Sequence, residues 1–216
     1  MTYSVKEIYY TLQGEGMHTG RAAIFLRFSG CNLWTGLEKD RRKGLGGCAR
    51  WCDTNFVGTD GPGGGKFAGA AQLADAVSRL WPHAAPSKSR PFVVCTGGEP
   101  LLQLDSNLLS VFEAEGFDVA AETNGTQAVP LGRLWLTVSP KANAPLRTMK
   151  GNELKLVYPQ DGMDPGQFID LEFDHFFLQP LDGPEKAENT QRALNYCLAN
   201  PQWRLSVQTH KYIGIP

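Results

Sequence analysis

The segment 91–100, Pro-Phe-Val-Val-Cys-Thr-Gly-Gly-Glu-Pro, joins an apolar run to a glycine-rich turn. The run 91–96 predicts a buried strand, and the residues from Thr96 to Pro100 predict the turn at which the chain leaves the sheet. Ligands of parallel α/β sheets bind at this end of the strands. Gly97 and Gly98 leave room for a ligand and expose backbone N–H and C=O groups, and the Glu99 carboxylate suits a ligand ammonium. Taken alone, the same residues are more typical of a plain turn.

From Lys66 onward, helices and strands alternate along the chain. We expect helices at 67–80, 104–115 and about 186–199. We expect further strands at 5–10, 22–28, 117–122 and about 134–139, 153–158, 175–179 and 203–208. Such alternation predicts a mostly parallel sheet. A complete eight-fold barrel needs about 250 residues and a helix for each strand. We therefore predict an α/β fold in one domain over residues 1–216, a partial, open β/α barrel with about six mostly parallel strands and about three helices.

Composition excludes several classes of protein. The formal net charge is −1, so the basic excess of a nucleic-acid-binding surface is absent overall. No apolar run approaches the ~18 residues of a membrane span, and the N-terminus lacks a signal-peptide core. We therefore expect a cytoplasmic protein with no nucleic-acid or membrane partner. In that compartment an odd set of five cysteines indicates metal binding or catalysis before disulfides.

Three of the cysteines lie in a polar, glycine-rich stretch at about 30–65. Sixteen residues separate Cys31 from Cys48, and three separate Cys48 from Cys52. Three thiolates suit a four-iron cluster with one iron left open, whereas a structural zinc site needs four ligands. On spacing alone an iron–sulfur cluster, a zinc site and buried thiols all remain open. Cys95, in a strand, and Cys197, in an amphipathic helix, are typical of buried thiols. The charged segment 38–43 predicts a solvated loop or helix.

Polar residues also follow three later strands. They form the segments Glu122-Thr123-Asn124-Gly125, Ser139-Pro140-Lys141 and Gln179-Pro180-Leu181-Asp182. One polar strand end is ordinary. Several in succession, on the side where the cysteine loop begins, predict a rim around an elongated polar ligand.

Short motifs carry a resemblance that runs from residue 6 to the last residue. They are Thr-Leu-Gln-Gly-Glu-Gly (11–16), Phe-Leu-Arg-Phe-Ser-Gly-Cys-Asn-Leu-Trp (25–34), Cys-Asp-Thr (52–54), the turn 96–100, the segments 122–125 and 139–141, Gly-Asn-Glu-Leu-Lys (151–155), Gln-Pro-Leu-Asp-Gly-Pro (179–184) and Gln-Thr-His-Lys-Tyr (208–212). On these motifs the chain resembles the radical S-adenosylmethionine enzymes and, within them, the family of 7-carboxy-7-deazaguanine synthases. The resemblance implies a modified form of the radical-enzyme barrel.

The cysteine spacing departs from the superfamily pattern, in which three and then two residues separate the cysteines. Family members with a first gap of about fourteen residues exist, and here the gaps are sixteen and three. Trp51 still precedes Cys52, as the pattern requires. A bulge can absorb an extra residue, and Gly46 and Gly47 supply conformational freedom.

The resemblance implies a set of cofactor contacts. It assigns Cys31, Cys48 and Cys52 to a [4Fe–4S] cluster and Thr54 to Mg²⁺. For S-adenosylmethionine it implies contacts from Trp51, Cys52, Asp53, Gly98, Glu99, Glu122, Ser139, Pro140, Lys141, Gln179, Pro180, Leu181 and Asp182. One hydroxyl is a poor Mg²⁺ site alone, so we expect the ion to bind well only with substrate oxygens present.

The resemblance also implies the reaction. It is the conversion of 6-carboxy-5,6,7,8-tetrahydropterin to 7-carboxy-7-deazaguanine with loss of ammonia, on the route to queuosine. Because the cofactor starts the chemistry, we expect no catalytic side chain to act as a general base. Substrate contacts are expected from Leu12, Gln13, Gly14, Glu15, Arg27, Thr96, His210 and Pro216, with the tail 209–216 closing the site. The implied partners are an electron donor such as flavodoxin or ferredoxin and a second copy of the chain.

Two other hypotheses fit parts of the sequence. An activating enzyme for a glycyl-radical partner protein shares the cluster and the Gly-Gly-Glu turn. Such an enzyme does not need Arg27 and a buried C-terminal carboxylate to bind a small acid. A zinc-binding interaction module shares only the cysteines.

Overall fold

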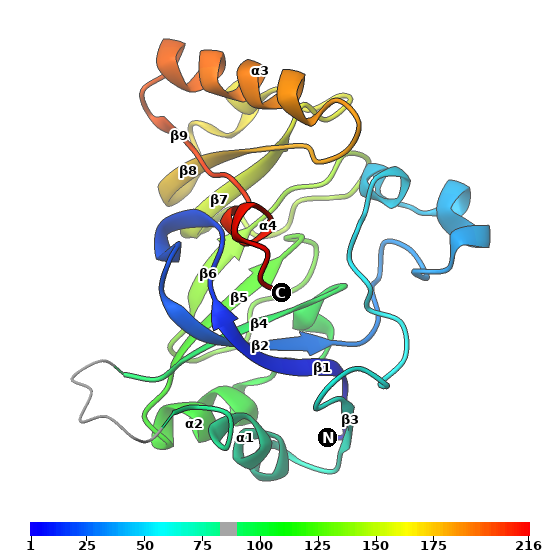
Figure 1. The fold of residues 1–216 in the computed structure, drawn as a ribbon, viewed down its shortest axis with the longest axis vertical. Coiled ribbons are helices and arrows are strands. Elements are labelled where there is room, and N and C mark those ends of the chain that lie inside the picture. Colours follow the sequence, from blue (N-terminus) through cyan, green and yellow to red (C-terminus); the bar gives the residue numbers. More distant parts are fainter. Residues whose placement is uncertain (83–89) are drawn as a thin grey trace.

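A computed structural model describes residues 1–82 and 90–216. Its framework is one nine-stranded sheet in the order β3-β1-β2-β4-β5-β6-β7-β8-β9 (Figure 1). The strands are β1 (Tyr3–Leu12), β2 (Ala22–Phe28), β3 (Gly65–Phe67), β4 (Phe92–Gly97), β5 (Asp118–Thr123), β6 (Trp135–Val138), β7 (Lys150–Tyr158), β8 (Glu172–Pro180) and β9 (Trp203–Leu205). All neighbours from β2 to β9 are parallel, whereas β1 is antiparallel to both β2 and β3.

The predicted α/β fold with an open, mostly parallel sheet is confirmed. The six predicted strands after Lys66 correspond to β4–β9, and the two at the N-terminus correspond to β1 and β2. The sheet is wider than six strands because β2 pairs with β4 and carries β1 and β3 with it. Strand β3 was not predicted. It has three residues, and pairing of Tyr3, Ser4 and Val5 with 65–67 forms it.

The three predicted helices are also confirmed. They are α1 (Ala70–Ser78), α2 (Ser106–Ala114) and α3 (Lys186–Ala199). Helix α2 begins where the Asp105 carboxylate accepts a hydrogen bond from the Leu108 amide, which is an N-cap. A fourth helix, α4 (Thr209–Ile213), lies in the tail and was not predicted. In the described residues, every helix is too short or too polar to cross a membrane.

The two faces of the sheet differ because side chains alternate along each strand. In β4, Val93 and Cys95 belong to the large core. Helices α1, α2 and α3 also contribute to that core. Phe92 and Val94 point to the other face, where they form a small apolar cluster with Ala23 and Ala120.

On this second face strands β2, β4 and β5 end in polar side chains. Residues two apart on a strand share a face. Beyond Ala23, Val94 and Ala120 of the small cluster, the same face therefore carries Arg27 in β2, Thr96 in β4 and Glu122 in β5. The same alternation places Lys155 of β7 and Gln179 of β8 on this face. In β2, β4 and β5 the apolar start of the strand therefore anchors the sheet, and the carboxyl end presents polar groups.

Candidate active site

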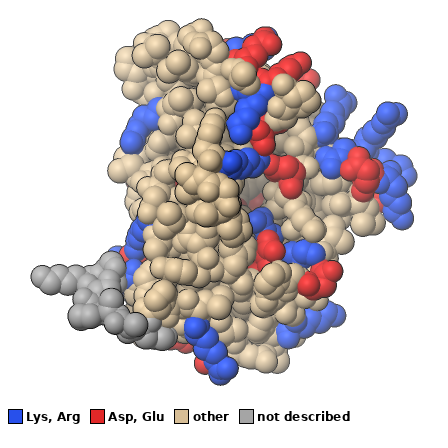
Figure 2. All heavy atoms as spheres, in the orientation of Figure 1, with Lys and Arg blue, Asp and Glu red and all other residues tan. Residues whose placement is uncertain are grey.

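A cavity of about 390 Å³ lies at the carboxyl ends of the strands, a volume typical of small-ligand sites. Figure 2 shows charged side chains of both signs around a recess on this face. Most of the predicted site residues line the cavity: Leu12, Gln13, Glu15, Arg27, Cys31, Cys48, Trp51, Cys52, Asp53, Thr54, Thr96, Gly98, Glu122, Ser139, Lys141, Gln179, His210 and Pro216.

The second and third cysteines lie on one helical turn. The short 3-10 helix η3 (Gly47–Arg50) carries Cys48, whose carbonyl oxygen accepts from the amides of Trp51 (3.0 Å) and Cys52 (2.8 Å). Residues four apart on a helical turn are neighbours on the same side. The three-residue gap is therefore accommodated by a turn that directs both thiols into the cavity.

The three thiols are close enough to influence one another. Burial raises the pKa of Cys48 to about 11, and the charges of Cys52 and Cys31 add to this while Lys141 opposes it. Burial likewise raises the pKa of Cys31. Among residues 1–82 and 90–216, no three His, Cys, Asp or Glu side chains are grouped to hold one metal ion. A set of three thiols on one cavity wall suits a group with several metal atoms better than a closed zinc site.

An aromatic cluster supports the cysteine loop from behind. Trp34 and Phe56 are buried and meet edge to face, with ring centroids 5.7 Å apart. Cys31 and Cys52 both pack against this pair. The positions of two of the three thiols are therefore fixed by apolar packing, which also excludes water from their inner side.

The Gly97-Gly98 turn packs directly against the first cysteine. A Cβ atom on Gly98 would lie 2.6 Å from the Cβ of Cys31, and Gly97 has φ +141°. The Glu99 amide donates to the Gly30 carbonyl at 3.1 Å. These glycines are thus required where the turn and the cysteine loop meet, in addition to any room that they leave for a ligand.

Glu99 itself lies behind the cavity wall. Its carboxylate is fully buried and accepts hydrogen bonds from the Leu101 amide (3.0 Å), the Thr123 hydroxyl (2.7 Å) and the Asn124 amide (2.7 Å). Burial raises the pKa of Glu99 overall, although these three hydrogen bonds lower it. In this structure the carboxylate therefore joins the turn after β4 to the end of β5.

Two groups of the cavity lining suit a polar ligand. Lys141 is partly buried, and its ammonium donates to the Ser139 carbonyl at 2.9 Å and the Ser139 hydroxyl at 2.5 Å. Burial lowers the pKa of Lys141, and an anion bound beside it would favour the charged ammonium. Gln179 Oε1 is buried and has no hydrogen-bond donor among the described residues, which suits a ligand N–H or O–H. These features fit the carboxylate and the donor groups of S-adenosylmethionine.

Arg27 is held by two neighbours on β1. Its Nε donates to Glu7 Oε1 at 2.7 Å and its Nη2 donates to the Tyr9 hydroxyl at 3.1 Å. The Tyr9 ring stacks on Phe25 at 5.6 Å. Burial alone would lower the pKa of Arg27, but Tyr9 and Glu7 raise it overall. The guanidinium is therefore fixed in place and charged at the cavity wall.

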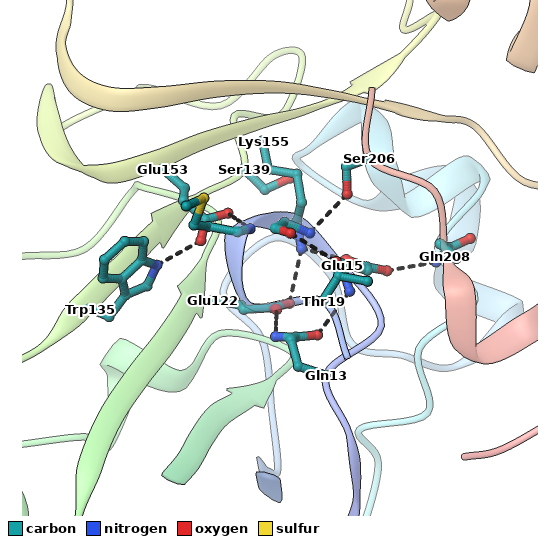
Figure 3. A network of polar contacts seen from close by, with 12 residues as sticks. Gln13, Glu15, Thr19, Glu122, Trp135, Ser139, Glu153, Lys155, Ser206 and Gln208 are labelled. Carbon is teal, nitrogen blue, oxygen red and sulfur yellow. Dashed lines mark hydrogen bonds and ion pairs between the residues drawn. The ribbon is translucent and has the colours of Figure 1, made fainter. Parts of the chain in front are cut away.

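Lys155 is the centre of a buried network (Figure 3). Its ammonium pairs with Glu15 and lies 3.4 Å from Glu122 Oε2. Gln13 donates to Glu122 at 3.0 Å, and Gln208 donates to Glu15 at 3.0 Å. Burial alone would raise the pKa of Glu15, but Lys155 and Gln208 lower it overall. Glu15 is therefore an ionised acceptor inside the protein.

The C-terminal tail lies along the same cavity. The Thr209 amide donates to the Gly14 carbonyl at 2.9 Å, and the Thr11 hydroxyl donates to the Pro216 oxygen at 3.1 Å. Lys211 Nζ lies 2.7 Å from Asp53 Oδ2 and 2.6 Å from Asp182 Oδ2. The tail thus contacts both the end of β1 and the cofactor side of the predicted site.

A few predicted contacts lie away from the cavity lining: Gly14, Glu99, Pro140, Pro180, Leu181 and Asp182. Asp182 pairs with Lys211 and Lys186, and Gly14 packs against His210. Several lining residues had no predicted role: Glu7, Tyr9, Phe25, Lys155 and Lys211. Lys155 could have been identified from the sequence, because it is a charged residue within the apolar run of the predicted strand 153–158.

An open, mostly parallel α/β sheet with cysteines and polar groups at the carboxyl ends of its strands is the architecture of a radical S-adenosylmethionine enzyme. No family model matches the chain. The chain is similar to QueE from Escherichia coli, a solved structure, with a TM-score of 0.66 and 27% identity over 97% of this chain and 95% of that one.

Curated relatives cover the whole chain. It is 59% identical over 216 residues to the 7-carboxy-7-deazaguanine synthase of Bordetella pertussis and 56% identical over 216 residues to that of Caulobacter vibrioides. Both alignments span 100% of each protein. The chain belongs to the 7-carboxy-7-deazaguanine synthase family.

Proposed function

We propose that the protein converts 6-carboxy-5,6,7,8-tetrahydropterin to 7-carboxy-7-deazaguanine with loss of ammonia, as a lyase of queuosine biosynthesis. The observation that carries the proposal is one cavity that joins three thiols to a fixed arginine and a glutamate paired with Lys155. Family membership supplies the reaction, and the cavity supplies groups that match both the cofactor and the substrate.

The residues at the cysteine end would hold the cofactors. Cys31, Cys48 and Cys52 would bind a [4Fe–4S] cluster, with Lys141 and Gln179 facing the carboxylate and donor groups of S-adenosylmethionine. When bound, the cluster and S-adenosylmethionine together supply the radical that starts the reaction by removing a hydrogen atom. Thr54 lines the same cavity and would contribute one ligand to Mg²⁺, with substrate and water supplying the others.

The residues at the other end would orient the pterin. Arg27 offers the guanidinium fork that suits a carboxylate. The amide and amino edge of the pterin presents donors, which the ionised Glu15 and the Pro216 oxygen would accept. Lys155 keeps Glu15 charged. Gln13 and Thr96, which line the same cavity, would flank the ring. Positioning of this kind replaces acid–base catalysis where the cofactor starts the chemistry.

The remaining parts of the proposal rest on family membership. We propose one domain over residues 1–216 whose tail 209–216 closes the site, a cytoplasmic location, assembly as a homodimer, and a small electron carrier such as flavodoxin or ferredoxin as reductant. The four contacts that the tail makes, with the end of β1, Gly14, Asp53 and Asp182, support its closing role.

An anaerobic assay tests the proposal. Protein reconstituted with iron and sulfide is given 6-carboxytetrahydropterin, S-adenosylmethionine and a reductant, with and without Mg²⁺. We expect the deazapurine to form, faster with Mg²⁺. We also expect Arg27→Gln to raise the KM for the pterin, whereas Arg21→Gln, which alters an arginine paired with Asp118, should not. Cleavage of S-adenosylmethionine without any deazapurine would favour the glycyl-radical activating enzyme instead.

A further inference from the structure

The charged segment 38–43 forms a short 3-10 helix, η2 (Glu38–Lys43), beside the cysteine turn. In Figure 2 lysines and arginines gather on the projecting part of the surface that η2 occupies in Figure 1. Lys39, Arg42 and Lys43 are exposed, as predicted for a solvated segment. Arg41 differs, because its side chain is only 27% exposed.

Arg41 donates hydrogen bonds to the backbone of the cysteine turn. Its Nη1 lies 2.7 Å from the Ala49 carbonyl oxygen and 3.2 Å from that of Cys52. Its Nε lies 2.9 Å and 2.8 Å from the two carboxylate oxygens of Glu38. The guanidinium is therefore oriented by Glu38 and directed at the end of the turn.

The same guanidinium covers the aromatic cluster. Its central carbon lies 4.7 Å from the centroid of the Trp34 ring. Trp34 in turn contacts Phe56, and Cys31 and Cys52 pack against the cluster that these two rings form with Ala49. One side chain thus contacts the turn that carries Cys48 and Cys52 and the apolar support of Cys31.

We propose that Arg41 is a positioning residue that holds the helical turn between Cys48 and Cys52 in the geometry that cluster binding needs. The proposal rests on the proposed function, since it takes these cysteines as cluster ligands. The last carbonyl groups of a helical turn lack partners within the turn, and a basic side chain can satisfy them. The planar fork of arginine can reach two carbonyls and stack on Trp34 together, which the point charge of lysine cannot do.

The unloaded protein provides the first test. Hydrogen–deuterium exchange is followed in peptides that cover 47–54, where the Trp51 and Cys52 amides donate to Cys48. We expect Arg41→Gln to speed this exchange roughly tenfold, because the turn opens locally without its charged hydrogen bonds. Arg42→Gln, which alters an exposed arginine of the same helix, should leave it unchanged. Glu38→Gln should give an intermediate increase and is the alternative should Arg41→Gln misfold.

The loaded protein provides the second test. We expect Arg41→Gln to bind less iron and to give a broadened EPR spectrum of the reduced cluster, with Arg41→Lys intermediate and Arg42→Gln like wild type. If Arg41→Gln shows the same hydrogen–deuterium exchange over 47–54 and the same EPR spectrum as the wild-type protein, the inference is overturned. If wild-type protein takes up no iron while exchange still depends on Arg41, the proposed function fails and the role of Arg41 in holding the turn stands.

Discussion

The amide nitrogen of Cys52 lies 2.8 Å from the carbonyl oxygen of Cys48, to which it donates a hydrogen bond that closes one helical turn. The radical-enzyme pattern has two residues between these cysteines, and this chain has three. A turn of this kind brings residues four apart to the same side. The added residue therefore changes the local backbone while both thiols still line the cavity.

If Cys48 is a ligand, its removal should abolish cluster assembly. We expect Cys48→Ala to retain less than about half of the wild-type iron and sulfide after anaerobic reconstitution and to form no deazapurine. Cys197→Ala is the control, since Cys197 lies in α3 and outside the cavity lining. Wild-type iron content in Cys48→Ala would show that the helical turn does not serve the cluster.

The contact between the glycine turn and the cysteine loop predicts that Gly98→Ala is damaging. Its Cβ would overlap Cys31 and the Gly30 backbone, so we expect a loss of about 1 to 3 kcal/mol in the free energy of unfolding, measured by denaturant titration, together with weaker iron uptake. Gly69→Ala is the matched control because a Cβ at Gly69 meets nothing within 4 Å. Equal stability of the two variants would contradict the close packing.

The buried pair of Lys155 and Glu15 predicts a pH-dependent contribution to stability. Lys155→Met leaves carboxylates buried without their cation, and we expect it to lower the free energy of unfolding by about 3 to 5 kcal/mol at neutral pH. The exposed Lys150 of the same strand offers the control Lys150→Met.

The direction of this pH dependence follows from the lowered pKa of Glu15. A carboxyl group with a lowered folded-state pKa stabilises the protein above its ordinary value of 4.5 and loses that contribution as the pH falls through the lowered value. The difference in the free energy of unfolding between wild type and Lys155→Met, measured by denaturant titration, should therefore become smaller below pH 4.5. A difference that widens on acidification would argue against an ionised Glu15.

Lys211 links the tail to Asp53 and Asp182, so Lys211→Gln should loosen the closed site. Because both ion pairs are partly exposed, we expect a modest effect, a roughly threefold to tenfold rise in the KM for the pterin with little change in kcat. Lys186→Gln alters a lysine that pairs with Asp182 and leaves the contact between Lys211 and Asp53. It should raise the KM less. A larger effect at Lys186 would place the closing contact elsewhere.

Much of the fold followed from local patterns in the sequence. The short apolar runs predicted strands, and the helical spacing of apolar residues at 186–199 predicted a helix. The structure has each of these elements. Strand β3 and helix α4 had no such signal, because three and five residues are too few for a period. Tertiary contacts form them, through pairing with β1 and through the bond from Thr209 to Gly14.

The candidate site was predictable where function leaves a motif at a strand end, as at Thr96, Glu122 and Ser139. It was not predictable where a role depends on register between distant strands. Glu7 and Tyr9 reach Arg27 only because β1 and β2 pair antiparallel. Arg41 belongs to a segment that composition alone describes as solvated, and its partial burial depends on the turn that follows it.

The central claim is that three cysteine thiolates hold a four-iron cluster and leave one iron to S-adenosylmethionine. The most direct measurement is the EPR spectrum of the anaerobically reduced, reconstituted protein before and after addition of S-adenosylmethionine. We predict a signal from one [4Fe–4S] cluster whose g values shift when the cofactor is added. An unchanged spectrum, or a colourless protein that holds one zinc ion, would contradict the account.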